Sequence, residues 1–376
     1  MVYRMTDNER VFNKQYIRYG GIFLDNSSEN GKQILGEVDR IRKKINGYYK
    51  DRKALFVNLN GTTTEKSLKN INSEAGKYHP YVNLYCADAG DINAFAGKAD
   101  GDYYMGILKG VFLKVPNEIK DYVTDECFGN VLEIGKCMPK TILNSLTEHC
   151  LDFFTFHEFF HIMNGHCDLI KSMGISELRE DNSECSMNGL DLQTLEFDAD
   201  CCAIASIINE YFRDQFMIID SIDGMNGRPN LDSTVQFISG VLIAIYILHS
   251  LLNTQKIIPQ QITDEYLQYM THPLPGTRLL YVWATISTII TSLNIYSKEE
   301  INEISERAYT SVFSFINEFK DIAYPGFMKI AIEPVGIRHM QKLNDNWKLI
   351  REKLDVHYNE LAPYEEIDFK TIFEGR

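Results

Sequence analysis

The chain has 376 residues, of which 44% are apolar, so it can fill a large core across two or three units of roughly 150 residues each. Its 52 acidic residues against 38 basic ones give a formal net charge of -14. That balance argues against a nucleic-acid partner, because phosphate binding needs clustered Lys and Arg.

The cysteines and the N-terminus point to a reducing compartment. The eight cysteines show neither a CxxC pair nor the spacing of a disulfide framework, so we expect reduced thiols and no cysteine zinc knuckle. Residues 1–16 contain no apolar run of signal-peptide length. We therefore expect a cytoplasmic protein.

The predicted elements change character along the chain. A helical stretch at residues 34–49 and a short apolar run at 54–59 come first, and two strand-like runs, Tyr81–Cys86 and Tyr103–Val115, follow. From residue 141 onward the apolar residues recur at helical spacing, in segments near 141–163, 192–213, 234–253, 277–293 and 299–319. The sequence thus predicts an α+β, mostly α fold, in which a small antiparallel sheet packs against several buried helices.

Two of these helices carry no formal charge over a length that could span a membrane, Ser233–Gln255 and Leu279–Ser297. Both contain polar residues, such as Ser239, His249 and Thr288, and neither is flanked by a Lys/Arg cluster. We expect buried core helices and no membrane partner.

Residues 150–166, CLDFFTFHEFFHIMNGH, predict a helix that is apolar nearly all round and ends at Asn164–Gly165. His157 and His161 are four residues apart and share one helix face, with Glu158 beside them. This is the HExxH arrangement of zinc peptidases. The alternative is a hydrogen-bonded pair of core histidines with a chance glutamate between them. Burying an unpaired carboxylate costs several kcal/mol, which favours the metal.

A catalytic zinc usually takes three protein ligands, so a further donor is needed. Glu196 and Asp200 are four apart at the start of a second apolar helix, where one carboxylate can bind zinc while the other orients a ligand histidine. The alternative is an acidic first turn favoured by the helix dipole. His166 is a rival third ligand, but it lies beyond Gly165 and off the histidine face, so we expect it behind the site.

The order HEFFHIMNGH, EFDAD and THPLPGTR resembles the gluzincin zinc metallopeptidases of the HtpX and CAAX-prenyl protease type, whose pattern is HExxH, ExxAD and a later HP followed by Arg. Residues 92–96, INAFA, resemble that family's NAFA strand. The surroundings are also similar to soluble phage-exclusion (Lit-like) peptidases. The resemblance covers about residues 90–295 and implies a zincin-like metallopeptidase domain at 81–297, between an N-terminal region 1–80 and a C-terminal helical region 298–376.

Carried over to this sequence, the resemblance implies three zinc ligands: His157, His161 and Glu196. It implies a general base and an oxyanion donor: Glu158 and His272. It implies two supporting groups, one behind a ligand histidine and one near the transition state: Asp200 and Arg278. It also implies a strand that holds the substrate: Asn93, Ala94, Phe95 and Ala96.

Two features depart from this pattern or allow another interpretation. Phe159 and Phe160 stand where the family has small or β-branched residues, and we expect these larger side chains to narrow the pocket. His272 precedes a proline, so it could be a simple turn residue. A membrane span at Ser233–Gln255 would place His272 across the bilayer from Glu196, which again favours a core helix.

The sequence therefore predicts a zinc-dependent endopeptidase with a polypeptide substrate, in which Glu158 activates a zinc-bound water. One alternative is a zinc-stabilised, non-catalytic interaction protein that uses the polar loop Lys171–Gln193 as its contact surface. The other is a membrane-associated peptidase. The natural substrate and the oligomeric state are not predicted.

Overall fold

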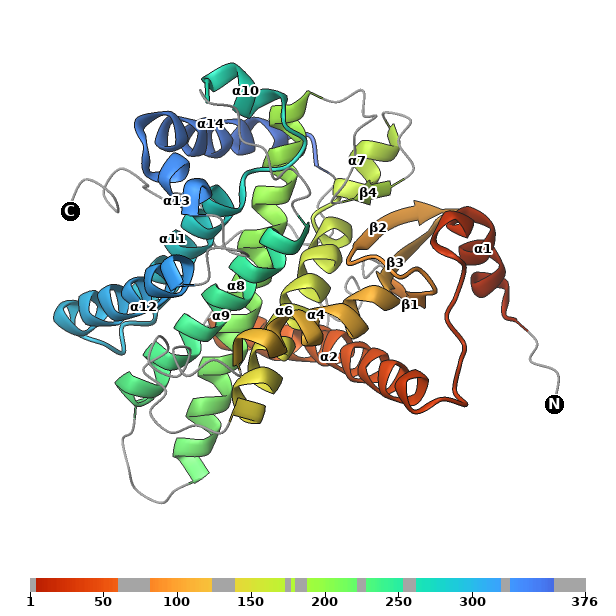
Figure 1. Ribbon diagram of the computed structural model, residues 1–376, viewed down its shortest axis with the longest axis horizontal. Coiled ribbons are helices and arrows are strands. Elements are labelled where there is room, and N and C mark those ends of the chain that lie inside the picture. Colours follow the sequence, from red (N-terminus) through yellow and green to blue (C-terminus); the bar gives the residue numbers. More distant parts are fainter. Residues whose placement is uncertain are drawn as a thin grey trace.

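The computed structural model describes residues 5–59, 82–123, 139–172, 177–179, 188–221, 228–252, 262–318 and 325–354. Two long helices, α6 (Pro139–Met163) and α8 (Gly189–Ser221), run side by side through its centre. A small sheet lies on one side of this pair, and the helices α11 to α14 lie on the other (Figure 1). The predicted α+β, mostly α fold is confirmed.

The remaining helices surround the central pair. The N-terminal region contributes α1 (Asp7–Gln15), the short 3-10 helix η1 (Ile17–Tyr19) and α2 (Glu29–Leu59). After the sheet come α4 (Lys109–Val123), α7 (His166–Ser172), α9 (Leu231–Leu252) and α10 (Asp264–Tyr269). The C-terminal part contains α11 (Pro275–Leu293), α12 (Lys298–Glu318), α13 (Pro325–Ile332) and α14 (Pro334–Arg351).

The sheet is mixed, not antiparallel throughout as the sequence predicts. Its four strands lie in the order β1 (Val82–Ala87), β3 (Asp102–Leu108), β2 (Ala94–Ala99) and β4 (Glu177–Arg179). β1 runs parallel to β3, whereas β2 is antiparallel to both β3 and β4. The prediction failed because alternating apolar residues indicate strands without indicating the direction in which they pair.

The predicted strand Tyr103–Val115 is also wrong beyond Leu108, where α4 begins without an intervening loop. Val111, Val115 and Ile119 are each fully buried and four residues apart, the spacing of one helix face. A short apolar run fits both periods, so its length alone could not separate strand from helix.

Both faces of the sheet are covered. Side chains alternate along the strands, so one set joins the main core with α2, α4 and α6: Ala94, Ala96, Met105 and Ile107. The opposite set packs under aromatic residues of the N-terminal segment: Phe95 and Tyr104 lie against Phe12, Tyr16 and Tyr19. The described part of region 1–80 therefore shares its core with the rest of the fold.

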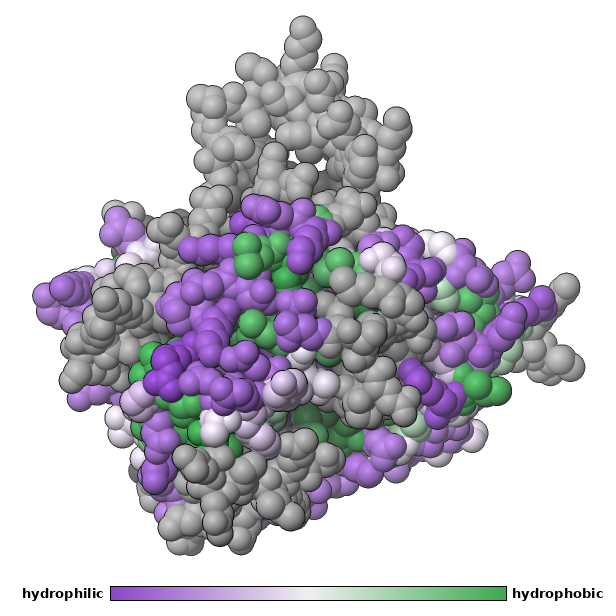
Figure 2. Space-filling view, turned by 90° about the horizontal axis from the view of Figure 1, so that it is seen from above, coloured by the Kyte–Doolittle hydropathy of each residue, from purple (hydrophilic) through white to green (hydrophobic). Residues whose placement is uncertain are grey.

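Of the part of the chain that the structure describes, one helix is long and apolar enough to cross a membrane, α9. Its residues from Ile238 to His249 are all buried, and it packs against α6, α11 and α12. The face shown in Figure 2 is mostly hydrophilic where residues are coloured, and its apolar patches are small and separated. In this fold α9 is a core helix, as the sequence predicts.

We predict that Gly106→Ala destabilises the protein. A Cβ atom at Gly106 would lie 2.2 Å from the ring of Phe95, its cross-strand partner, and Phe95 is fully buried. Overpacking of this kind typically costs about 1–3 kcal/mol in the free energy of unfolding, measured by urea titration. Gly36→Ala, on the exposed face of α2 with nothing within 4 Å, is the control and should stabilise slightly. Equal effects of the two substitutions would contradict the packing described here.

Candidate metal centre

The histidine helix is an interior element. Every residue of α6 from 151 to 163 is buried, and the helix ends where Gly165 adopts a φ of 78°, as the Asn164–Gly165 signal predicts. The Gly165 N–H donates to the carbonyl of Ile162 at 3.1 Å. This turn lets α7 start at once with His166, which brings His166 back toward the histidine face.

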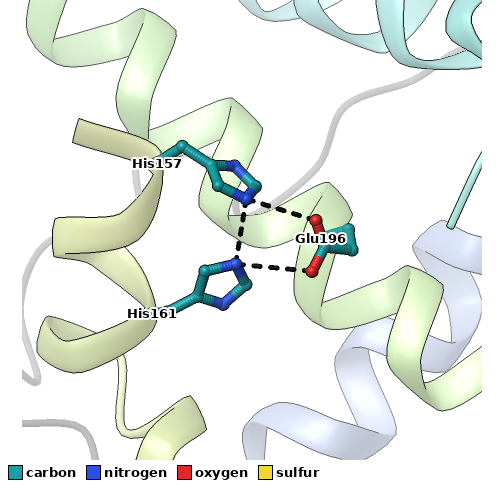
Figure 3. A group of neighbouring side chains, drawn as sticks. All are labelled: His157, His161 and Glu196. Atoms are coloured by element: carbon teal, nitrogen blue, oxygen red, sulfur yellow. Dashed lines mark hydrogen bonds and ion pairs between the residues drawn. The ribbon is translucent and has the colours of Figure 1, made fainter. Parts of the chain in front are cut away.

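The second helix supplies the third ligand atom. Residues 192–205 of α8 are all buried against their surroundings, and α8 packs along α6. Glu196 thereby faces His157 and His161 from the neighbouring helix (Figure 3). The three residues are at most 3% exposed. In the described part of the chain, they form a group of His and Glu side chains whose ligand atoms lie within 4.8 Å of one another, close enough to hold one metal ion.

The spacing of the three ligand atoms fits a metal ion. The two histidine Nε2 atoms lie 3.0 Å apart, and they lie 3.2 Å (His157) and 3.4 Å (His161) from the two carboxylate oxygens of Glu196. Two ligand atoms at ~2.0–2.1 Å from a tetrahedral zinc are about 3.3 Å apart. A buried His157–His161–Glu196 group can therefore hold a metal ion with little movement.

Asp200 fixes the outer side of His157. Its Oδ1 lies 2.8 Å from His157 Nδ1, and the carboxylate accepts two hydrogen bonds from Arg278 at 2.7 Å and one from Tyr281 at 2.5 Å. The Nη2 of Arg278 also lies 3.6 Å from Glu196. Asp200 and Arg278 thus sit behind the ligands, where they hold His157 and Glu196 in place.

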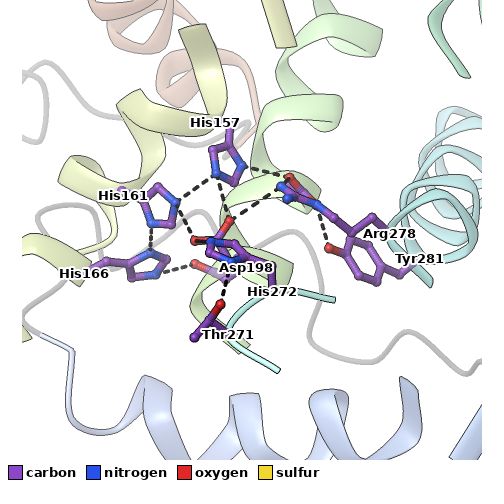
Figure 4. Close-up of polar contacts among 10 residues, drawn as sticks. His157, His161, His166, Asp198, Thr271, His272, Arg278 and Tyr281 are labelled. Carbon is purple, nitrogen blue, oxygen red and sulfur yellow. Dashed lines mark hydrogen bonds and ion pairs between the residues drawn. The ribbon is translucent and has the colours of Figure 1, made fainter. Parts of the chain in front are cut away.

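His166 holds the outer side of His161. The Nδ1 atoms of the two rings lie 2.9 Å apart, and His166 Nε2 lies 3.1 Å from Asp198 (Figure 4). His166 is fully buried and does not join the three inward-facing ligand atoms. This agrees with the sequence interpretation, which preferred Glu196 as the third ligand.

The contacts at the Nδ1 atoms of His157 and His161 determine whether their Nε2 atoms donate or accept hydrogen bonds. A neutral imidazole has one N–H donor and one acceptor. If His157 donates through Nδ1 to Asp200, and His161 donates through Nδ1 to His166, both Nε2 atoms present lone pairs to each other and to Glu196. Three acceptors then meet in a buried space, an arrangement that requires a cation or a proton between them.

The pKa values show where that proton lies in the metal-free protein. Burial lowers the pKa of His157, but Glu196 and Asp200 outweigh this and hold it well above its usual value. Burial, together with His157 and His166, holds the pKa of His161 well below its usual value. Burial raises the pKa of the Asp200 carboxyl, but Arg278 and His157 outweigh it and keep Asp200 ionised. One proton therefore resides on His157.

Of the two predicted catalytic groups, Glu158 is buried next to a ligand histidine in the chain, and His272 approaches the ligands directly. Glu158 follows His157 on α6 and is 2% exposed. His272, on the segment before α11, brings its Nε2 to 3.9 Å from Glu196 and is held through Nδ1 by the Thr271 hydroxyl at 3.0 Å. Its side chain is 16% exposed, more than those of the three ligands.

The predicted substrate strand is only partly available. Asn93 precedes β2, and its side chain accepts from the N–H of Ala94 at 2.8 Å. Phe95 points into the aromatic core, away from any surface. Phe95 and Ala96 also pair with residues 179 and 178 of β4, so in this structure both edges of β2 are occupied by the chain's own strands.

Sequence reasoning missed three residues that contact the centre from behind: Asp198, Tyr281 and Trp347. Asp198 stands between Glu196 and Asp200 in the EFDAD segment, where its side chain is expected on another helix face. Tyr281 lies three residues beyond Arg278, a spacing that could have suggested it. Trp347 is 149 residues from Asp198, and no local signal links the two.

Comparisons with protein families, with curated proteins and with solved structures find no match for this chain. The functional interpretation therefore depends on the residues of the centre and on their geometry.

We predict that zinc binding at neutral pH releases about one proton, because His157 must give up its inner proton to become a ligand. Apparent affinity should then rise about tenfold per pH unit while pH remains below the raised pKa of His157, and should level off above it. Calorimetric titration in buffers of different ionisation enthalpy counts the protons. Release of none would show that the inner nitrogen of His157 carries no proton before zinc binds.

Proposed function

We propose that the protein is a zinc-dependent endopeptidase of the gluzincin type, acting on polypeptides. The observation that carries this proposal is the spacing of His157, His161 and Glu196, which matches a three-ligand zinc site. Three protein ligands leave a fourth position open, as in catalytic sites; structural sites usually have four.

A zinc ion bound there would supply an activated water, whose pKa falls from 15.7 to about 7. Glu158, next to a ligand histidine, is the group that takes the proton as this water attacks a peptide carbonyl. His272 is the donor that approaches the developing oxyanion. Asp200 and Arg278 keep their charges paired and hold His157 and Glu196 still.

The exposure of the side chains indicates how a polypeptide would approach. The three ligands are nearly inaccessible, whereas His272 reaches the surface with 16% of its side chain. We infer that substrate enters over His272. A substrate that extends the sheet would either pair with β4 or replace it along Phe95 and Ala96 of β2.

Compartment and partners follow from the same proposal. The described cysteines are buried thiols that form no disulfide among themselves: Cys86, Cys150, Cys167, Cys201 and Cys202. They support a reducing, cytoplasmic setting. The acidic net charge and the burial of α9 support a polypeptide partner over nucleic acid or a membrane.

The burial of the ligands favours a second candidate, a metal-stabilised interaction protein without turnover. In that case the metal would raise the stability of the fold, and Glu158 would have no chemical task. The predicted contact loop Lys171–Gln193 lies partly outside the described residues, which include β4 and the ends of the two flanking helices.

We predict that Glu158→Gln keeps zinc and fold but loses at least two orders of magnitude in peptide hydrolysis, because general-base catalysis is worth about 100-fold to 10,000-fold. Zinc-loaded protein is incubated with a denatured whole-cell proteome, and new peptide N-termini are identified and timed by mass spectrometry. The matched control is Glu148→Gln, an exposed glutamate on the same helix, which should cleave like wild type.

Undiminished cleavage by Glu158→Gln would refute the assigned mechanism. If neither wild type nor variant produces new N-termini while removal of zinc lowers the melting temperature of both, the interaction protein becomes the better account.

A further inference from the structure

A second buried polar chain leads away from the metal centre through His161. His161, His166 and Asp198 are at most 4% exposed and follow one another at 2.9 Å and 3.1 Å. The chain continues to α14, where Trp347 Nε1–H donates to Asp198 Oδ1 at 2.7 Å. Asn164 adds a further donor to Asp198 Oδ2 at 2.5 Å.

The partners of Asp198 assign the direction of every hydrogen bond in this chain. An ionised carboxylate only accepts, so His166 must carry its hydrogen on Nε2. The Nδ1 of His166 is then an acceptor, and the hydrogen between the two rings belongs to Nδ1 of His161. His161 is thereby left with a lone pair on Nε2, the atom that faces His157 and Glu196.

We propose that Asp198 and Trp347 are positioning residues that set the tautomer of His161 for metal binding, acting through His166. This inference rests on the proposed metal centre. It gives the C-terminal helix α14 a role in the site: Trp347 occupies Oδ1 of Asp198, so that Oδ2 is directed at His166. Partners of this kind typically change metal affinity by about 10-fold to 100-fold.

The amide of Asn tests this assignment without changing the shape of residue 198. An amide has one oxygen, so in Asp198→Asn either Trp347 or His166 loses its acceptor. Trp347→Phe removes the donor that competes with His166 and Asn164 for the single amide oxygen. In the double variant the amide oxygen can face His166 again, which restores the tautomer of His161.

The experiment titrates the full-length chain with Co²⁺ and Zn²⁺ against a competing chelator and records the visible spectrum of the Co²⁺ form. We expect Asp198→Asn to bind about 10-fold to 100-fold more weakly, with a shifted spectrum. Trp347→Phe should weaken binding less, and the double variant should bind more tightly than Asp198→Asn alone. The control is Trp283→Phe, because Trp283 is the other tryptophan of the chain and packs against Tyr309 in the core.

A pair of His166 variants covers the case in which Asp198→Asn does not fold. In His166→Asn, the side-chain carbonyl can accept a hydrogen bond from His161 Nδ1, so this variant should bind metal with an affinity close to wild type. His166→Leu offers no acceptor and should lose metal affinity. Metal-free melting temperatures separate loss of fold from loss of affinity.

Two results overturn different statements. If the wild type binds neither metal, the proposed centre fails. If the wild type binds and Asp198→Asn matches its affinity and spectrum, or if the double variant shows only additive losses, the centre stands and the positioning role is wrong.

Discussion

The meeting of three acceptor atoms in a buried space is the constraint on which the rest of the centre depends. Two imidazole nitrogens and a carboxylate lie 3.0–3.4 Å apart among residues at most 3% exposed. Such a group is stable only with a cation or a proton at its middle. The metal-free protein meets this demand by raising the pKa of His157. A zinc ion would meet it by replacing that proton.

The surrounding fold keeps the ligands from turning away. The two ligand histidines are each held at the outer nitrogen, His157 by Asp200 and His161 by His166. The supports come from distant parts of the chain, with Arg278 from α11 and Trp347 from α14. The C-terminal helices therefore help to maintain the centre, although the ligands themselves lie on α6 and α8.

The sequence could predict those parts of the site that depend on local spacing. Two histidines four apart on an apolar helix must share a face, and the Gly165 cap ends that helix where expected. Glu196 could be chosen because it opens the next long apolar helix. The partners Asp198 and Trp347 could not, because their approach depends on how α14 packs against α8.

The same limit applies to the sheet. Alternating apolar residues indicated β1 and β3. The direction in which these two strands pair depends on the path of the chain between them, which passes through β2 on the far side of β3. The run that follows Tyr103 contains both a strand and the start of α4, because seven apolar-rich residues fit either period. The sequence could not predict that the outer edge of β2 is occupied, because its partner strand β4 follows the histidine helix far along the chain.

X-ray absorption at the zinc edge identifies the ligand atoms of a bound zinc ion without requiring a substrate. For zinc-loaded protein we expect two imidazole nitrogens at ~2.0–2.1 Å, with the remaining ligands oxygen and no sulfur. We expect His157→Ala and His161→Ala each to remove that imidazole signature. A zinc–sulfur distance of ~2.3 Å, or an imidazole pair that survives both substitutions, would contradict a metal centre at His157, His161 and Glu196.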